Sequence, residues 1–406
     1  MIYLSMPGLR FLTSGESHGK ALSGIIEGIP ANLLLSPADI DCELKRRQSG
    51  FGRGGRMKIE ADRAEILSGV RWGKTIGSPI TLLIENRDHK NWLEGMSSDS
   101  AAKDSIPAVT RPRPGHADLA GALKYDQHDI RNILERSSAR ETAMRVALGA
   151  VAKRFLAEFR VRVGSFVIQI GDQGTEVRSL KSDEEELLFL FTKAEASPVR
   201  CPDEASAKGM VEVIEKAMKE GNSLGGIFEV FVTGLPVGLG SHVQWDRRMD
   251  GRLAQALMSI QAIKGVEVGA GFEMAGRFGS DTMDEIFYGV QGEGGQGPKG
   301  GFYRKTNNAG GIEGGMTNGM PVVVRAAMKP IPTLRKPLNS VDILTKRPFE
   351  AAYERSDVCA VAAASVVGEA MTALTVADAF LEKIGGDSME EVKRNFEGYL
   401  EYLKQF

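Results

Sequence analysis

The sequence contains few cysteines and almost no net charge. Three of its 406 residues are cysteines, Cys42, Cys201 and Cys359, and they lie too far apart to form a CxxC pair or a zinc-binding spacing. This spacing argues against a disulfide framework and against a metal site. The formal net charge is −2, so the surface as a whole does not attract polyanions, and any anion-binding site must be local.

The sequence also lacks a recognisable targeting or membrane segment. Its N-terminus, MIYLSMPGLRFLTSG, has no charged segment followed by an apolar one. The longest apolar run, around Cys359 to Val367, is too short to span a bilayer. With 42% hydrophobic and 26% charged residues, the composition is typical of a globular protein. We therefore expect a cytoplasmic protein that does not bind membranes.

No linker-like segment divides the chain, so we expect a single domain over residues 1–406. Two pairs of motifs nevertheless recur in the same order about half a chain apart. LSGIIEGIP (22–30) matches EVFVTGLP (229–236), and GKTIGSPI (73–80) matches GMTNGMPV (315–322). One interpretation is an internal duplication, over about 10–160 and 220–385, around a pseudo-two-fold axis. The other is a chance match of glycine–proline turn chemistry, which is common.

Periodicity and capping signals predict a mixture of helices and strands. Ser36-Pro37-Ala38-Asp39 combines an N-cap residue, a proline at the first helical position and an acidic third residue, so a helix is expected to run to Gln48. Further helices are predicted over 139–159, 208–219, 249–260 and 360–381, and strands over 66–70, 80–85, 162–170, 227–233 and 322–326. Helices and strands do not alternate regularly, which favours an α+β fold with antiparallel sheets over a doubly wound fold.

The pentapeptide GESHG (15–19) matches G-x-S-x-G, the nucleophile elbow of serine hydrolases. An elbow requires a strand, a sharp turn and then a helix. Only one short strand can precede residue 15, and residues 21–28 alternate like a second strand. The pattern therefore argues against a nucleophilic Ser17. It indicates a glycine turn between strands, in which His18 either has a structural role or faces a ligand.

A basic, glycine-rich segment follows the first predicted helix. KRRQSGFGRGGRMK (45–58) holds six cations and no acid, among them Arg47, Arg53 and Arg56. Guanidinium groups on a flexible backbone suit phosphate and carboxylate groups, which they bind bidentately. A solvated basic helix end is one alternative. An RGG-like RNA-binding segment is another, although that class usually repeats its motif in a basic chain, and this chain does neither.

Two further motifs combine arginine with histidine or serine. RPRPGHAD (111–118) holds Arg113 and His116 in a loop stiffened by prolines, where an imidazolium beside arginines needs an anion to offset it. ERSSARET (135–142) places Arg136 and Arg140 four residues apart, on one face if the segment is helical, and its two serines add hydroxyl donors. Both arrangements suit phosphate groups.

The last two motifs lie in the C-terminal part. KPIPT (329–333) is expected to be an extended cationic loop, and RSD (355–357) joins Arg355 to Asp357, which a structural ion pair would also explain. Several arginine clusters and two histidines in glycine loops, in a chain of near-zero net charge, indicate an enzyme that binds multiply charged small anions. A histidine can protonate a departing phosphate near neutral pH.

These motifs also resemble a known family. The chain resembles the chorismate synthase family from Arg10 to about Ala370, most specifically in GESHG, RRQSGFGRGGRMKIE, RPRPGHADL, ERSSARETAMR, the segment from EGGMTNG to KPIPT, and RSDVCAV. The resemblance implies a pseudo-symmetric β-α-β sandwich, with antiparallel sheets packed around central helices, usually as a homotetramer. It implies a carbon–oxygen lyase of the shikimate pathway that converts 5-enolpyruvylshikimate 3-phosphate to chorismate by anti-1,4-elimination of phosphate. It also implies a requirement for reduced FMN without net redox change.

The resemblance implies roles for individual residues. His18 would be the acid that helps phosphate leave, His116 would protonate or poise the reduced flavin, and Asp357 would assist deprotonation of the substrate through the flavin. Ser17 and Ser137 would orient these groups. The substrate anions would be held by Arg47, Arg53, Arg56, Arg113, Arg140 and Arg355. The FMN site would be lined by Arg136, Ser137, Ser138, Gln261, Ala262, Gly314, Lys329, Pro330, Ile331, Pro332, Thr333 and Arg355.

Two questions remain open at this level. By the same resemblance, Arg47 and Arg53 match positions that are assigned to NADP(H) binding in such families. That assignment overlaps the expected substrate site. No long insertion suggests a fused reductase, so we expect NADPH to act only indirectly, through an external flavin reductase. The alternative from another class is an RNA- or anion-binding protein that uses the RRQSGFGRGGR loop; we expect no nucleic-acid partner.

Overall fold

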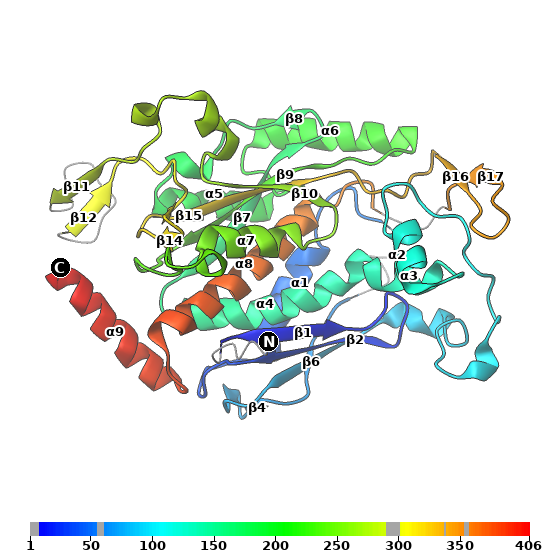
Figure 1. Ribbon diagram of the computed structural model, residues 1–406, viewed down its shortest axis with the longest axis horizontal. Coiled ribbons are helices and arrows are strands. Elements are labelled where there is room, and N and C mark those ends of the chain that lie inside the picture. Colours follow the sequence, from blue (N-terminus) through cyan, green and yellow to red (C-terminus); the bar gives the residue numbers. More distant parts are fainter. Residues whose placement is uncertain (1–7, 55–60, 290–300, 337, 353–356) are drawn as a thin grey trace.

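The structure is a computed structural model that describes residues 8–54, 61–289, 301–336, 338–352 and 357–406. Two antiparallel sheets face each other across a layer of helices (Figure 1). The helices are α1 (Pro37–Gln48), α2 (Asp118–Tyr125), α3 (Arg131–Ser137), α4 (Thr142–Ala157), α5 (Glu184–Ala196), α6 (Glu204–Glu220), α7 (Met249–Met258), α8 (Val361–Ile384) and α9 (Met389–Gln405).

The strands form two main sheets and several short hairpins. They are β1 (Arg10–Ser14), β2 (Ala21–Glu27), β3 (Glu65–Ile66), β4 (Val70–Arg71), β5 (Lys74–Thr75), β6 (Ile80–Glu85), β7 (Arg162–Ile170), β8 (Gln173–Gly174), β9 (Gly226–Thr233), β10 (Ile263–Val268), β11 (Ile286–Gly289), β12 (Gly301–Arg304), β13 (Ile312–Glu313), β14 (Met316–Thr317), β15 (Val322–Met328), β16 (Asn339–Val341) and β17 (Pro348–Glu350). The first sheet has the order β1-β2-β6-β3, and the second has the order β10-β15-β9-β7-β8.

The central helices bury the inner faces of both sheets. Helix α4 packs on β2 and β6 of the first sheet, α8 packs on β7 and β9 of the second, and the two helices contact each other. Helices α5 and α6 lie against the second sheet from outside (Figure 1). Strand β7 is therefore buried on both faces, and its residues Val163 to Ile168 are all buried, including Ser165. The predicted α+β sandwich is confirmed.

The two sheets share one connectivity. The order β1-β2-β6-β3 in the first corresponds to β7-β9-β15-β10 in the second. The paired motifs also make the same bonds. Thr75 Oγ1 donates to the carbonyl of Pro30 at 2.6 Å, and Thr317 Oγ1 donates to the carbonyl of Pro236 at 2.7 Å. This correspondence supports the predicted internal duplication, which stays a proposal about the origin of the chain.

Several predicted elements have the expected bounds, and two need correction. The predicted helix ending at Gln48 and the strands over 80–85 and 162–170 are confirmed. The helix expected from residue 139 begins only at Thr142, because Ser138 is extended (ψ 140°) and 139–141 form a 3₁₀ turn. The strand expected over 66–70 is divided between β3 and β4. Helices α2, α3, α5 and α9 and strand β10 are not among the predicted elements.

Helix α8 runs through the core and carries a buried carboxylate. It is long and apolar enough by composition to cross a membrane, but 83% of its most apolar window is buried inside the protein. Glu369 accepts hydrogen bonds from Arg46, Lys153, Arg200 and Ser165. Burial alone would raise the pKa of Glu369, but these cations outweigh it and hold that pKa well below its usual range. The network ties α1, α4 and β7 to α8.

Candidate active site

Most of the predicted site motifs come together at one end of the sandwich, where α1 ends and α4 and α8 begin (Figure 1). Near the end of α1, Arg47 donates to the carbonyl of Ala139 just before α4, at 2.9 Å. The N–H of Gly54 donates to Asp357 just before α8, at 2.6 Å. Helix N-termini carry partial positive charge and free N–H groups, so two of them favour an anion at this end.

GESHG forms a turn between two strands, as predicted, and not a nucleophile elbow. Strand β1 leads directly into it and β2 follows, so the helix that an elbow requires is missing. Gly15 has φ +103°, and a Cβ there would lie 2.4 Å from the carbonyl oxygen of Ala21, so the turn requires glycine. Ser17 is buried, with its Oγ 3.1 Å from Ser138 Oγ. The turn presents His18 at the site.

His18 is enclosed by acidic and aromatic side chains. Its Nδ1 lies 2.8 Å from Glu135 Oε1, and its backbone N–H donates to Glu135 Oε2 at 2.7 Å. On the other nitrogen, Nε2 lies 3.9 Å from Asp88 Oδ2. The ring packs on Trp92, with centroids 4.3 Å apart, and Arg131 lies over the same indole. These contacts fix the orientation of the ring.

His116 also has a buried carboxylate partner. Its Nδ1 lies 2.5 Å from Asp118 Oδ1 at the start of α2. Asp118 in addition accepts from Arg113 through the backbone N–H, Nε and Nη2. Burial would raise the pKa of Asp118, but the hydrogen bonds from His116 and Arg113 outweigh it and lower that pKa well below its usual range. The sequence analysis expected an anion beside His116 and the arginines of this loop. The carboxylate of Asp118 lies at that place.

A second group of charges, which we call the arginine cluster, consists of Arg47, Arg53, Arg140, Asp62 and Asp357. Arg140 Nη1 donates to Asp62 at 2.6 Å, and Arg53 pairs with Asp357 at 3.0 Å. Arg47 Nη1 is buried without a hydrogen-bond partner among the described residues, 3.6 Å from Asp62. Burial lowers the pKa of Arg47 to about 10; Asp62 opposes this, while Arg53 and Arg140 add to it. With three cations and two anions, the cluster has one net positive charge.

Not every predicted arginine is free to hold substrate. The guanidinium of Arg113 donates to Asp118 and to Thr333. Arg136 donates to the carbonyls of residues 13 and 15, whereas Arg140 is buried beside Asn86, so the two arginines do not share a helix face as predicted. The break at Ser138 is the reason. The remaining predicted arginines, Arg56 and Arg355, lie outside the described residues.

Most of the residues expected to bind the flavin meet beside α4. Gln261 Nε2 donates to Glu141 at 2.7 Å, and Ala262 accepts from the backbone N–H of Lys329 at 2.9 Å. Lys329 Nζ in turn donates to the carbonyl of Gly115, which joins the KPIPT loop to the His116 loop. Burial, and then the charge of Lys264, lower the pKa of Lys329. Ala262 has φ +67°, a conformation that costs a residue with a Cβ about 1–2 kcal/mol.

The remaining flavin residues are placed as follows. Ser137 Oγ lies 3.4 Å from the carbonyl of Leu134, and the carbonyl of Ile331 accepts from Ser223 Oγ at 2.6 Å. Gly314 lies apart, because Gly315 accepts from the N–H of Met249 at the start of α7, whereas Gln261 follows the end of that helix. The ten residues of α7 span about 15 Å. The structure therefore does not bring Gly314 to the other flavin residues within one chain. Pro330 and Pro332 lie in the same loop as Lys329 and Thr333.

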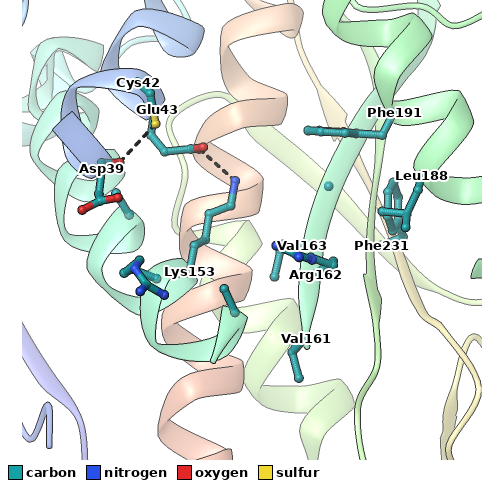
Figure 2. Close-up of a pocket in the computed structure, with 14 residues that line it drawn as sticks. Asp39, Cys42, Glu43, Lys153, Val161, Arg162, Val163, Leu188, Phe191 and Phe231 are labelled. Carbon is teal, nitrogen blue, oxygen red and sulfur yellow. Dashed lines mark hydrogen bonds and ion pairs between the residues drawn. The ribbon is translucent and has the colours of Figure 1, made fainter. Parts of the chain in front are cut away.

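A cavity of about 290 Å³ lies elsewhere, between α1, α4, β7 and α5, and contains none of the predicted site residues (Figure 2). Phe191, Leu188 and Phe231 form one wall. On the other side Cys42 Sγ donates to the carbonyl of Asp39, and Lys153 pairs with Glu43. These charges already have partners in the protein, so the cavity adds nothing to the site.

Sequence reasoning missed several residues that shape this end of the molecule. Glu135 and Asp118 lie within quoted motifs but have no predicted role. Asp62, Asp88 and Trp92 lie outside every quoted motif. The segment NRDHKNW (86–92) concentrates amide, acidic, histidine and tryptophan side chains, and that density is the signal that could have identified it.

The comparisons with known proteins all point to one family. The family model described as chorismate synthase matches residues 9–381. A chorismate synthase of Aquifex aeolicus is 59% identical over 406 residues, covering 99% of this chain and all of that protein. One of Geobacter sulfurreducens is 60% identical over 398 residues, covering 98% of this chain and all of that protein. A crystal structure of chorismate synthase is similar with a TM-score of 0.78 and 50% identity, covering 98% of this chain and 99% of that one.

Proposed function

This chain belongs to the chorismate synthase family, and on that premise we propose how its residues convert 5-enolpyruvylshikimate 3-phosphate to chorismate and inorganic phosphate. The enzyme is a carbon–oxygen lyase of the shikimate pathway, which leads to the aromatic amino acids. The observation that carries the residue assignment is the arginine cluster, a group of net positive charge in which Arg47, Asp62 and Arg140 are buried. It is joined to the His18 turn through Asn86, which accepts from Arg140 and donates to the carbonyl of Gly19.

The residues beside α4 have the donors and acceptors that reduced FMN requires. Gln261 Oε1 and Glu141 Oε2 are buried and have no hydrogen-bond partner among the described residues. Lys329 supplies a cation and Ser137 a hydroxyl, which suit a flavin phosphate and ring edge. We propose that these residues, with Ala262 and the loop to Thr333, hold the cofactor. When bound, reduced flavin supplies the transient electron density that a plain acid–base site lacks.

We propose that side chains of the protein carry out the proton transfers and stabilise the departing phosphate. His18 gives the proton on Nε2 to the departing phosphate, because its Nδ1 is already bonded to Glu135. Arg47 and Arg53 stabilise the charge that develops on phosphate. Asp357, held by Arg53 and the N–H of Gly54, supplies the carboxylate that assists removal of the substrate proton. His116 holds a proton beside the cofactor residues.

For assembly, location and the source of electrons, membership of the family is the only support. We propose a cytoplasmic homotetramer whose flavin is reduced by an external reductase, with NADPH acting only through that reductase. Arg47 is almost fully buried, so it suits a small phosphate better than a dinucleotide. An RNA-binding function receives no support from the comparisons. The RNA-binding function would be favoured only if the protein bound RNA in a salt-sensitive way and had no affinity for flavin.

The test is an anaerobic turnover assay. Purified protein is mixed with 5-enolpyruvylshikimate 3-phosphate and chemically reduced FMN, and chorismate is followed by its ultraviolet absorbance. Chorismate that forms only with reduced flavin is the expected result. Folded protein that yields no chorismate under these conditions would refute the proposed function. Oxidised FMN and protein without flavin are the matched controls.

A further inference from the structure

Both predicted catalytic histidines are bonded through Nδ1 to a carboxylate that is almost fully buried. Glu135 is 3% exposed and lies 2.8 Å from His18 Nδ1; Asp118 is 1% exposed and lies 2.5 Å from His116 Nδ1. The two pairs come from different elements, since Glu135 lies in α3 and Asp118 begins α2. The same arrangement therefore occurs at both histidines, although different elements supply the carboxylate.

We propose that Glu135 and Asp118 are positioning residues that keep a proton on Nδ1 of His18 and His116, so that Nε2 alone exchanges protons. This rests on the proposed function, which assigns proton transfer to these histidines. A carboxylate at Nδ1 stabilises the imidazolium before the proton leaves Nε2. After the transfer the ring is neutral and retains its proton on Nδ1. Nε2 can then be reprotonated by water.

At His18, only a carboxylate satisfies the contacts. One oxygen of Glu135 accepts the backbone N–H of His18 at 2.7 Å, and the other faces Nδ1. Glutamine has one acceptor and one donor at these two places. If its oxygen keeps the backbone N–H, its NH₂ group faces Nδ1 and forces that nitrogen to accept. The neutral ring of His18 would then carry its proton on Nε2.

At His116, both carboxylate oxygens of Asp118 likewise accept hydrogen bonds. Oδ1 accepts from His116 Nδ1 and Arg113 Nη2, and Oδ2 accepts from the backbone N–H and Nε of Arg113. All four partners are donors, so an asparagine NH₂ group would face a donor whichever way it turned. Arg113 therefore acts by holding Asp118, which is a different role from the substrate contact expected for it.

The decisive measurement is the position of the proton on each ring. The chain has five histidines, so ¹⁵N-histidine labelling gives few signals, which His18→Ala and His116→Ala variants assign. Solid-state ¹⁵N spectra of the full-length protein separate Nδ1–H from Nε2–H in the neutral ring. We expect Nδ1–H at both residues, and a change to Nε2–H at His18 in Glu135→Gln. Nε2–H at His18 in the unsubstituted protein would overturn the proposal without any variant.

Turnover supplies the second readout. Glu135→Gln should lower kcat by about 100-fold or more, within the range for losing a general acid, while KM changes by less than about threefold. Glu16→Gln is the matched control, because Glu16 is an exposed carboxylate in the same turn, and it should keep full activity and the Nδ1–H form. A Glu135→Gln enzyme with full kcat would refute the positioning role. Absence of chorismate from the unsubstituted protein would refute the proposed function, while the spectra would still decide where the proton lies.

Discussion

Methionine substitution of the adjacent residues Arg46 and Arg47 should affect stability very differently. Arg47 is fully desolvated, and the fall in its pKa from 12.5 to about 10 corresponds to about 3 kcal/mol against the charged form. Methionine removes that penalty but also removes the bonds to Thr142 and Ala139, each about 1.5 kcal/mol at the lower end of the range for a charged donor. The two terms nearly cancel, so the free energy of unfolding should change by about 1 kcal/mol or less.

At Arg46, in contrast, the neighbouring carboxylates outweigh the cost of burying the charge. Burial by itself lowers its pKa, but Glu369, Glu195 and Glu43 outweigh it and raise that pKa above the usual value. Arg46→Met leaves Glu369 buried with one cation fewer, which typically costs about 3–5 kcal/mol. Unfolding a chain of this length involves an entropy of about 0.85 kcal/mol/K, so Tm should fall by about 4–6 °C.

Thermal unfolding with and without inorganic phosphate, together with steady-state kinetics, separates the two arginines. Arg47→Met should keep its Tm, lose the stabilisation that phosphate gives, and raise the substrate KM by at least about tenfold. Arg46→Met should lose stability but keep the phosphate effect. If Arg47→Met lost as much Tm as Arg46→Met, or still gained stability from phosphate, the arginine cluster would not be a preformed anion site.

Three further predictions use other parts of the structure. His18→Ala and His116→Ala should fold normally, as judged by circular dichroism, and lose about 100- to 10,000-fold in rate; near-normal turnover in either would remove that residue's role. Because the folded-state pKa of Glu369 is depressed, its contribution is present above about pH 4.5 and is lost as the pH falls. Urea unfolding at several pH values should therefore show a weaker acid dependence in Glu369→Gln, and an unchanged dependence would contradict this. Gly149→Ala should destabilise by about 1–3 kcal/mol despite alanine's higher helix propensity, because its Cβ would lie 2.4 Å from Ala370 Cβ; a more stable variant would show that α4 and α8 can separate freely.

Local signals were enough to predict many elements and the site motifs. The first helix has its cap, proline and acidic third residue within four positions, and the Asp39 carboxylate does bond back to the Ser36 N–H at 2.8 Å. Strand β7 is a nine-residue segment rich in valine, isoleucine and phenylalanine, a composition that favours a strand in a sheet covered on both faces. Such features depend on neighbours within a few residues, so the sequence contains them completely.

The sequence by itself determined the class of fold and the segments that form the site; the tertiary structure decided which charges are paired. Arg140 meets Asp62 across 78 positions and Asn86 across 54, and His18 meets Glu135 across 117. Nothing local to Arg140 distinguishes a buried structural arginine from one that holds substrate. Pairing of charges depends on distance and on exclusion of water, and both arise only when segments distant in the sequence pack together.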